Sequence, residues 1–207
     1  GPIYATNATV DLADIMLRDS GHIQENDIKY VNKKRRKQGQ RDLDPIYTQK
    51  DAIMALPQFH SLWYQQKKEV IPGVTAQFIE AGHILGSAAV VLDYQDDAGN
   101  PKRLWFSGDI GRYDVPILRD PVFPNKAHTV LMECTYGNKP HESMEDAYDE
   151  FIDAVKRTVN RGGKVIVPAF AVGRTQNLTY FLSEAIENGD LPDIPVVVDS
   201  PLAVNAS

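Results

Sequence analysis

Almost every strand-like run in this sequence leads directly into a short polar motif. The apolar or β-branched runs cover residues 74–80, 88–94, 103–106, 129–132, 164–167 and 196–198. Glycine, histidine, carboxylate or hydroxyl residues follow most of them at once. In α/β proteins, catalytic and binding residues lie in the loops at strand ends. This feature therefore constrains both the fold and the location of a functional site.

Helical patterns alternate with these strands. A helix is predicted from Thr6, which can cap it, to about Asp19, with Ser20-Gly21 ending it. Thr48, with Asp51 three residues on, predicts a short second helix. Two later helices are expected to open at Ser143 and after Arg174. The order predicts an α/β fold with a hairpin of 88–94 and 103–106 and, later in the chain, a parallel sheet.

Composition excludes several classes of protein. No apolar run approaches the roughly 20 residues of a spanning helix, and no secretory signal pattern is present, which predicts a cytoplasmic protein without membrane contact. A single cysteine, Cys134, excludes a multi-cysteine zinc cluster, so a metal would need His and carboxylate ligands. The net charge of −6 argues against binding nucleic acid by bulk positive charge, and the basic run 32–37 is interpreted mainly as a solvated face.

Two strand ends carry candidate metal ligands. The first motif, residues 80–87, brackets His83 with glycines, and the second, residues 107–112, contains Asp109. The predicted hairpin places both at one sheet edge, and imidazole and carboxylate are ligands for a hard or borderline divalent metal. A structural histidine in a turn and an aspartate that accepts backbone amides are the alternative.

Further strand ends carry a carboxylate and an arginine. Glu133 follows the run 129–132, and such a carboxylate must be paired or lie in a solvated cleft. Residues 162–175 then give a strand, a loop and a helix start, where free amides and Arg174 could hold a phosphate, although no Walker motif is present. The last run, 196–198, ends at Asp199-Ser200.

Taken together, these segments resemble the metallo-β-lactamase-fold nucleases of the β-CASP group, which include pre-mRNA 3′-end-processing endonucleases and RNase J. The resemblance rests on five segments in order: 80–87, 106–112, 133–137, 162–174 and 198–202. Residues 1–6 and 47–51 are also similar to the bacterial type of this family. The fold it implies is a partial αββα sandwich followed by the start of a β-CASP α/β domain with a parallel sheet.

The resemblance also implies site residues. His83 is expected to bind metal and Asp109 to bridge two zinc ions, while Glu133 is the acidic residue expected to orient a histidine of the opposite domain. Phosphodiester hydrolysis of RNA is the reaction that such a site supports. RNA is the expected partner and a homodimer is an open alternative. Candidate contacts to the substrate are Arg112, His141, Gly173, Arg174 and Ser200.

Part of the family pattern is missing from these 207 residues. The His-x-His-x-Asp-His motif and the two later histidine motifs have no match. The sequence is therefore interpreted as a middle section, with residues 1–137 in the metallo-β-lactamase domain and 138–207 in the β-CASP domain, and as inactive alone. A hydrolase of small-molecule esters or thioesters and a non-catalytic subunit of an RNA-processing complex are the alternatives.

Overall fold

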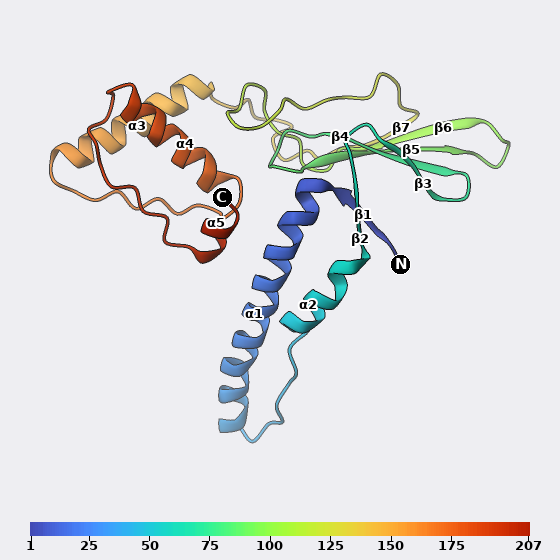
Figure 1. Cartoon of the computed structure of the whole chain (residues 1–207), viewed down its shortest axis with the longest axis horizontal. Helices are drawn as coiled ribbons and strands as arrows, with labels where there is room; N and C mark the ends of the chain where they lie inside the picture. The colour runs from blue at the N-terminus through green and yellow to red at the C-terminus, as the bar shows by residue number, and fades with distance from the viewer.

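The strands that carry the candidate ligands lie in one five-stranded sheet (Figure 1). The computed structural model describes all residues from Gly1 to Ser207. In spatial order the strands are β3 (Lys67–Ile71), β4 (Val74–Glu80), β5 (Ala88–Gln95), β6 (Pro101–Phe106) and β7 (Thr129–Leu131). Neighbours from β3 to β6 are antiparallel, and β7 joins β6 in parallel. Strands β4, β6 and β7 therefore end at the same edge.

Cross-strand apolar pairs hold this sheet together. Ile79 lies opposite Ala89, and Val91 lies opposite Trp105. These four residues form one buried cluster, against which Ile110 packs. Directly opposed side chains on one face are the stabilising unit of an antiparallel sheet. The predicted hairpin of 88–94 and 103–106 is confirmed.

The longest helix begins beside this sheet. Strand β1 (Ile3–Thr6) precedes the two N-terminal helices and strand β2 (Phe59–Leu62) follows them. The two strands pair in parallel. Helix α1 (Asn7–Lys37) runs well past Asp19, so the predicted end at Ser20-Gly21 is wrong. Gly21 is buried where α1 meets the start of the next helix, and a Cβ there would lie 2.7 Å from the backbone nitrogen of Gln49. The glycine permits close packing rather than ending the helix.

The second helix forms as predicted. Helix α2 (Gln49–Ala55) has a complete capping box between Thr48 and Asp51, and a 3-10 turn, η1 (Leu56–Gln58), follows it. No helix of the chain is both long and apolar enough to span a membrane.

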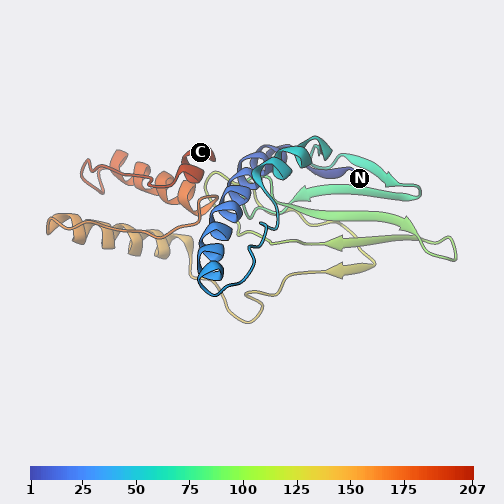
Figure 2. The same cartoon turned by 90° about the horizontal axis from the view of Figure 1, so that it is seen from below.

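Residues after the sheet form a helical region to one side of it (Figure 2). Its helices are α3 (Met144–Asn160), α4 (Arg174–Glu187) and α5 (Pro201–Asn205). Ser143 caps α3 as expected, and a second buried cluster joins α3, α4 and the following loop through Ile152, Val155, Ala185 and Leu191.

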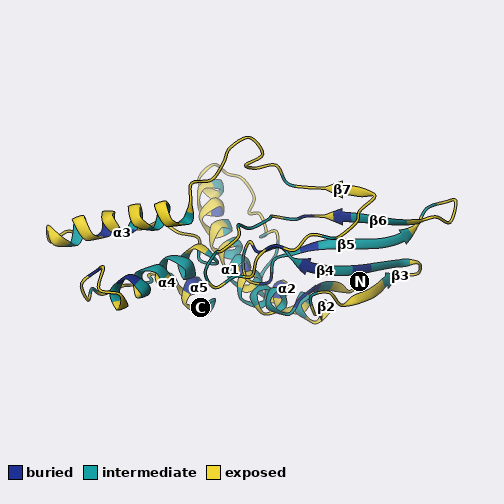
Figure 3. Ribbon diagram, turned by 90° about the horizontal axis from the view of Figure 1, so that it is seen from above, coloured by how far each residue is buried: buried dark blue, intermediate teal, exposed yellow.

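Two predicted strands of this region are wrong. Residues 164–167 and 196–198 lie outside any strand, so residues 138–207 contribute helices only. Ile166 is 90% exposed and Val197 is 81% exposed. The two runs have the composition of strands, but no neighbouring strand pairs with them, and the region is largely exposed (Figure 3).

Candidate metal and catalytic site

Three loops leave the shared edge of the sheet and carry the three acidic or histidine residues singled out in the sequence. The loop after β4 holds His83, the loop after β6 holds Asp109, and the segment after β7 holds Glu133. The sheet topology alone brings these three chain segments together, although they are as far as 50 residues apart in sequence.

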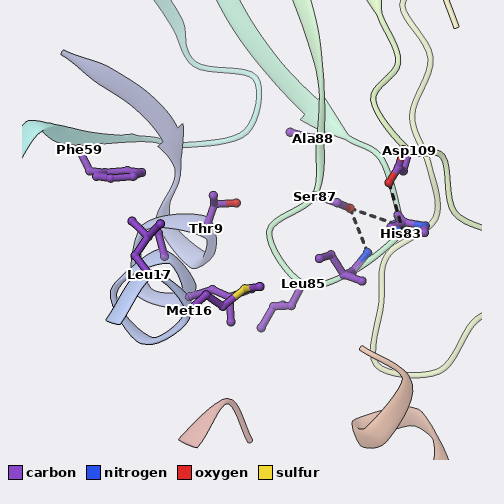
Figure 4. Close-up of a pocket in the computed structure, with 12 residues that line it drawn as sticks. Thr9, Met16, Leu17, Phe59, His83, Leu85, Ser87, Ala88 and Asp109 are labelled. Atoms are coloured by element: carbon purple, nitrogen blue, oxygen red, sulfur yellow. Dashed lines mark hydrogen bonds and ion pairs between the residues drawn. The ribbon is translucent and has the colours of Figure 1, made fainter. Parts of the chain in front are cut away.

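His83 and Asp109 face one another across the edge (Figure 4). The distance between His83 Nε2 and Asp109 Oδ2 is 3.8 Å, and the two side chains are 46% and 74% exposed. The two residues thus lie together at one sheet edge, as the predicted hairpin requires. A separation longer than a hydrogen bond, between two open side chains, leaves both groups available to a shared ligand.

A set of hydroxyl groups fixes the loop that carries His83. The backbone amides of His83 and Ile84 donate to Ser87 Oγ at 3.0 and 3.2 Å. From the other side, the Thr6 and Thr9 hydroxyls donate to the carbonyl of Gly86 at 2.7 and 2.9 Å. Thr6 is 3% exposed and also caps α1. The sequence predicted only the capping role of Thr6, because its bond to Gly86 joins residues 80 positions apart.

Tyr64 completes this support. Its hydroxyl donates to the carbonyl of Ser87 at 2.9 Å. Burial, reinforced by the nearby Glu80 carboxylate, raises the pKa of Tyr64 to about 12. The hydroxyl therefore stays protonated, and remains a donor to the loop, throughout the physiological pH range.

Gly111 lets the His83 and Asp109 loops touch through their backbones, and Gly82 lets the His83 loop lie against Arg119 and Pro121. Gly82 has a φ of +66°, and a Cβ on it would lie 2.8 Å from the carbonyl oxygen of Arg119. A Cβ on Gly111 would overlap the carbonyl of Gly82, while the Gly111 amide donates to the carbonyl of Ala81 at 2.8 Å. Only glycine fits this approach, which sets how far apart the two candidate ligands can be.

Glu133 is bound to the Asp109 loop. Its Oε1 accepts the backbone amide of Ile110 at 2.6 Å, and its own amide donates to the buried Ser107 Oγ at 3.1 Å. The Ile110 amide is the main reason that the pKa of Glu133 lies below its ordinary value, and the Thr135 hydroxyl lowers it further. Glu133 thus stays charged, and its carboxylate is bonded to Ile110, the residue that follows Asp109.

Arg112 and His141 contact protein groups near this edge. The Arg112 guanidinium donates to the carbonyl of Glu142, so it links the Asp109 loop to the segment after Glu133. The ring of His141 packs on Tyr136 with centroids 4.1 Å apart. The Arg112 bond holds the two loops against each other, and the ring contact lies within the segment after Glu133. Their predicted role in substrate binding stays a prediction.

The remaining candidates lie in the helical region. Gly173 has a φ of +80° and precedes α4, and a Cβ on it would lie 2.8 Å from Ile84 Cγ2 in the His83 loop. It therefore brings the start of α4 against that loop. The Arg174 side chain is exposed, and Ser200 Oγ caps α5 by accepting the Ala203 amide at 3.2 Å.

An apolar cavity of about 480 Å³ opens beside the pair (Figure 4). Side chains of the first turns of α1, including Leu12, Met16 and Leu17, line one wall, and the His83 loop lines the other. His83 and Asp109 are at its border. The cavity gives the candidate site an apolar flank that is open to solvent.

The donor set fits part of a metal site. No group of three or more His, Cys, Asp or Glu side chains in this chain is placed to hold a metal ion. Zinc takes about four ligands, commonly imidazole and carboxylate, so His83 and Asp109 can supply two of them. The chemistry of the pair is right for such an ion, and the number of ligands is incomplete within these residues.

Known proteins resemble the chain over nearly its full length, although no family model matches it. It is 34% identical over 203 residues to "Ribonuclease TTHA0252" of Thermus thermophilus, covering 98% of this chain and 41% of that protein. It is 32% identical to "Transcription termination factor FttA" of Methanosarcina mazei, covering 96% and 29%. "Cleavage and polyadenylation specificity factor 73" of Drosophila melanogaster is 32% identical over 160 residues, covering 76% and 22%.

The chain thus spans less than half the length of these relatives. The likeness to the first two covers nearly the whole chain, and therefore the sheet, its strand-end loops and the helical region. With the shared edge that brings His83, Asp109 and Glu133 together, it shows that the chain belongs to the β-CASP family of metallo-β-lactamase-fold ribonucleases.

Proposed function

We propose that a protein containing this chain hydrolyses RNA phosphodiester bonds in RNA processing or decay, with two zinc ions at the edge that carries His83 and Asp109. The observation that carries the proposal is the 3.8 Å approach of these two open side chains, with the charged Glu133 bonded beside Asp109. Relatives named as a ribonuclease and as a cleavage and polyadenylation factor support RNA as the substrate class.

Each residue has a separate task in this proposal. His83 Nε2 and Asp109 carboxylate oxygens would hold metal, and Ser87, Thr6 and Tyr64 keep the His83 loop in place. Glu133 holds the Asp109 loop through Ile110 and keeps negative charge at the edge. When bound, a pair of zinc ions lowers the pKa of water and neutralises charge on a phosphate.

We also propose a division of the chain at residue 137, with residues 1–137 in the metallo-β-lactamase domain and 138–207 in the β-CASP domain. The described contacts support it: the sheet and the helical region each have their own buried cluster. Residues 1–207 alone are expected to be inactive, because they offer two metal ligands. A cytoplasmic location and a homodimer belong to the same proposal.

The test is the variant Asp109→Ala in the longer protein. Loss of a direct metal ligand should lower RNA cleavage more than about a hundredfold, since even partners outside the ligand set cost 10- to 100-fold. The fold should persist, because the Asp109 side chain is 74% exposed. The matched control is Asp97→Ala, in the hairpin turn at the opposite end of the sheet, which should leave cleavage unchanged.

Cleavage of a labelled single-stranded RNA, bound zinc by elemental analysis and thermal unfolding should be measured on the same preparations. Full cleavage by folded Asp109→Ala protein would contradict the proposed site. Cleavage of a thioester with no cleavage of RNA by the unaltered protein would contradict the proposed substrate.

A further inference from the structure

Positive charge in this acidic chain is concentrated at one end of α1. Residues 29–42 contain seven lysines and arginines and one aspartate, a net charge of +6. The whole chain carries −6, so the other 193 residues carry −12. A polyanion would be repelled by most of this surface and attracted to one segment of it.

Three of the lysines lie on one exposed face of the helix. Lys29, Lys33 and Lys37 recur every four residues, which puts them in one stripe, and all three are exposed. Tyr30, 61% exposed, borders the stripe, and Lys34 Nζ lies 4.6 Å from the centre of its ring. An exposed aromatic ring among cations is a typical arrangement for contacts with single-stranded nucleic acid.

Residues between these lysines in the sequence fix the helix to the returning chain. Asn32, 8% exposed, exchanges two hydrogen bonds with the backbone of Leu43, at 2.8 and 2.9 Å. Arg35 Nε donates to the carbonyl of Arg41 at 2.8 Å, and Arg36 pairs with Asp42. The one acidic residue of the segment 29–42, Asp42, is thus already paired, and Lys29, Lys33 and Lys37 have no carboxylate partner.

This end of α1 projects away from the sheet and from α3 to α5 (Figure 1). The other end of α1 bonds to the His83 loop through Thr6 and Thr9. A helix rises 1.5 Å per residue, so Lys33 lies about 40 Å along the axis from that loop. The lysine stripe and the candidate metal site are therefore at opposite ends of one rigid element.

We propose that the lysine stripe, formed by Lys29, Lys33 and Lys37 with Tyr30 and Lys34 beside it, binds the phosphate backbone of RNA remote from the cleavage site. The inference rests on the proposed function for its choice of RNA. At about 3.4 Å per stacked nucleotide, a strand of about 12 nucleotides bridges the two ends of α1. The stripe holds the part of a long RNA that does not enter the site.

The experiment measures equilibrium binding of a fluorescent 30-nucleotide single-stranded RNA by the longer protein, in the non-cleaving Asp109→Ala background. The variant Lys29→Gln/Lys33→Gln/Lys37→Gln removes three charges and keeps helix-forming residues. At about 0.1 M salt its Kd should rise about tenfold or more. The slope of log Kd against log salt should fall by about 2, because each lost phosphate contact contributes about 0.7.

Two matched variants decide the outcome. Lys68→Gln/Lys126→Gln/Lys156→Gln removes the same charge from exposed positions elsewhere and should leave the Kd within about twofold. Lys29→Arg/Lys33→Arg/Lys37→Arg keeps the charge and should keep the affinity. Equal affinity of the stripe variant and the unaltered protein, or equal weakening by the two Gln variants, would overturn the proposal. Because binding is the readout, absence of nuclease activity would not affect this result.

Discussion

At the scale of single residues, the charge of Glu133 is what holds the Asp109 loop. The Ile110 amide donates to its carboxylate, and this hydrogen bond favours the charged form. The pKa of Glu133 is lower in the fold than the ordinary 4.5. A depressed carboxyl pKa stabilises the fold above the ordinary value, and this stabilisation is lost as the pH falls through the lowered value.

We therefore predict that the backbone amide signal of Ile110 titrates with a midpoint below 4.5. The Glu133→Gln variant keeps an acceptor oxygen but has no charge to titrate, so its Ile110 signal should be independent of acid pH. Amide chemical shifts followed by NMR from pH 7 to pH 3 test this. A midpoint at or above 4.5 in the unaltered protein would show that the carboxylate does not bind this amide.

Thr6 combines two structural tasks in one buried hydroxyl. It accepts the Thr9 amide at the start of α1 and donates to the carbonyl of Gly86. Thr6→Val keeps the shape and removes both bonds, so the free energy of unfolding should fall by about 1–3 kcal/mol. Thr6→Ser keeps the hydroxyl and should lose less than about 1 kcal/mol.

Urea unfolding gives the stability of both Thr6 variants, and zinc titration gives their metal affinity. If the hydroxyl positions the His83 loop, Thr6→Val should bind zinc more weakly at a temperature where it is still folded, and Thr6→Ser should not. Equal zinc affinity of the two variants would restrict Thr6 to a capping role.

At the scale of elements, the contact of α1 with α2 makes glycine the more stable residue at position 21, although alanine is usually more stable inside a helix. Glycine inside a helix usually costs about 1 kcal/mol relative to alanine. At Gly21, however, the added Cβ would meet the backbone of Thr48 and Gln49 at 2.7 to 2.9 Å. Backbone atoms at the start of α2 cannot move aside as a flexible side chain can.

Gly21→Ala should therefore lower the free energy of unfolding by about 1–3 kcal/mol. The control Asp27→Ala, at an exposed position of the same helix, should change it by no more than about 0.5 kcal/mol. Thermal and urea unfolding of both variants check the sign. Stabilisation by Gly21→Ala would mean that the two helices are not packed as closely as described.

Sequence patterns predicted the structural elements whose signals are local, and failed where a distant contact decides, as at Gly21. The capping box at Thr48, the cap at Ser143 and the hairpin could be predicted because their signals lie within a few residues. The end of α1 could not, because Ser20-Gly21 has the local pattern of a helix end while its cause is a contact with Gln49.

In the candidate site, too, some features could be predicted from the sequence and others could not. The proximity of His83 and Asp109 followed from the topology of the hairpin. The support from Thr6 and Tyr64 did not, because no local pattern reports a hydrogen bond to a carbonyl 80 or 23 positions away. Gly173 has a positive φ and a close approach that suit only glycine, but the group it approaches is Ile84. Its predicted contact with a phosphate stays a prediction.

At the scale of the whole molecule, the exposed surface is too large for a closed domain. The chain exposes 14454 Å², whereas a compact monomer of 23.1 kDa exposes about 9,700 Å². Only 21 of its 207 residues are buried. The excess includes the apolar runs 164–167 and 196–198, which have strand composition and no partner strand.

We infer that these two runs become strands in a longer protein, as their composition predicts. Isolated residues 1–207 should then bind the dye ANS and unfold over a broad temperature range, because their apolar surface is open and their two buried clusters are separate. The longer protein should bind little ANS. A sharp transition without dye binding by the isolated chain would contradict the inference.

Ile166 provides the sharper test. Its side chain is 90% exposed here, so Ile166→Glu should change the stability of the isolated chain by no more than about 0.5 kcal/mol. In the longer protein the same carboxylate would have to be buried between strands, and several kcal/mol of stability should be lost. Glu187→Gln, at the exposed end of α4, should be neutral in both proteins. An equal effect of Ile166→Glu in the two proteins would show that this run stays outside any sheet, whatever follows it in the chain.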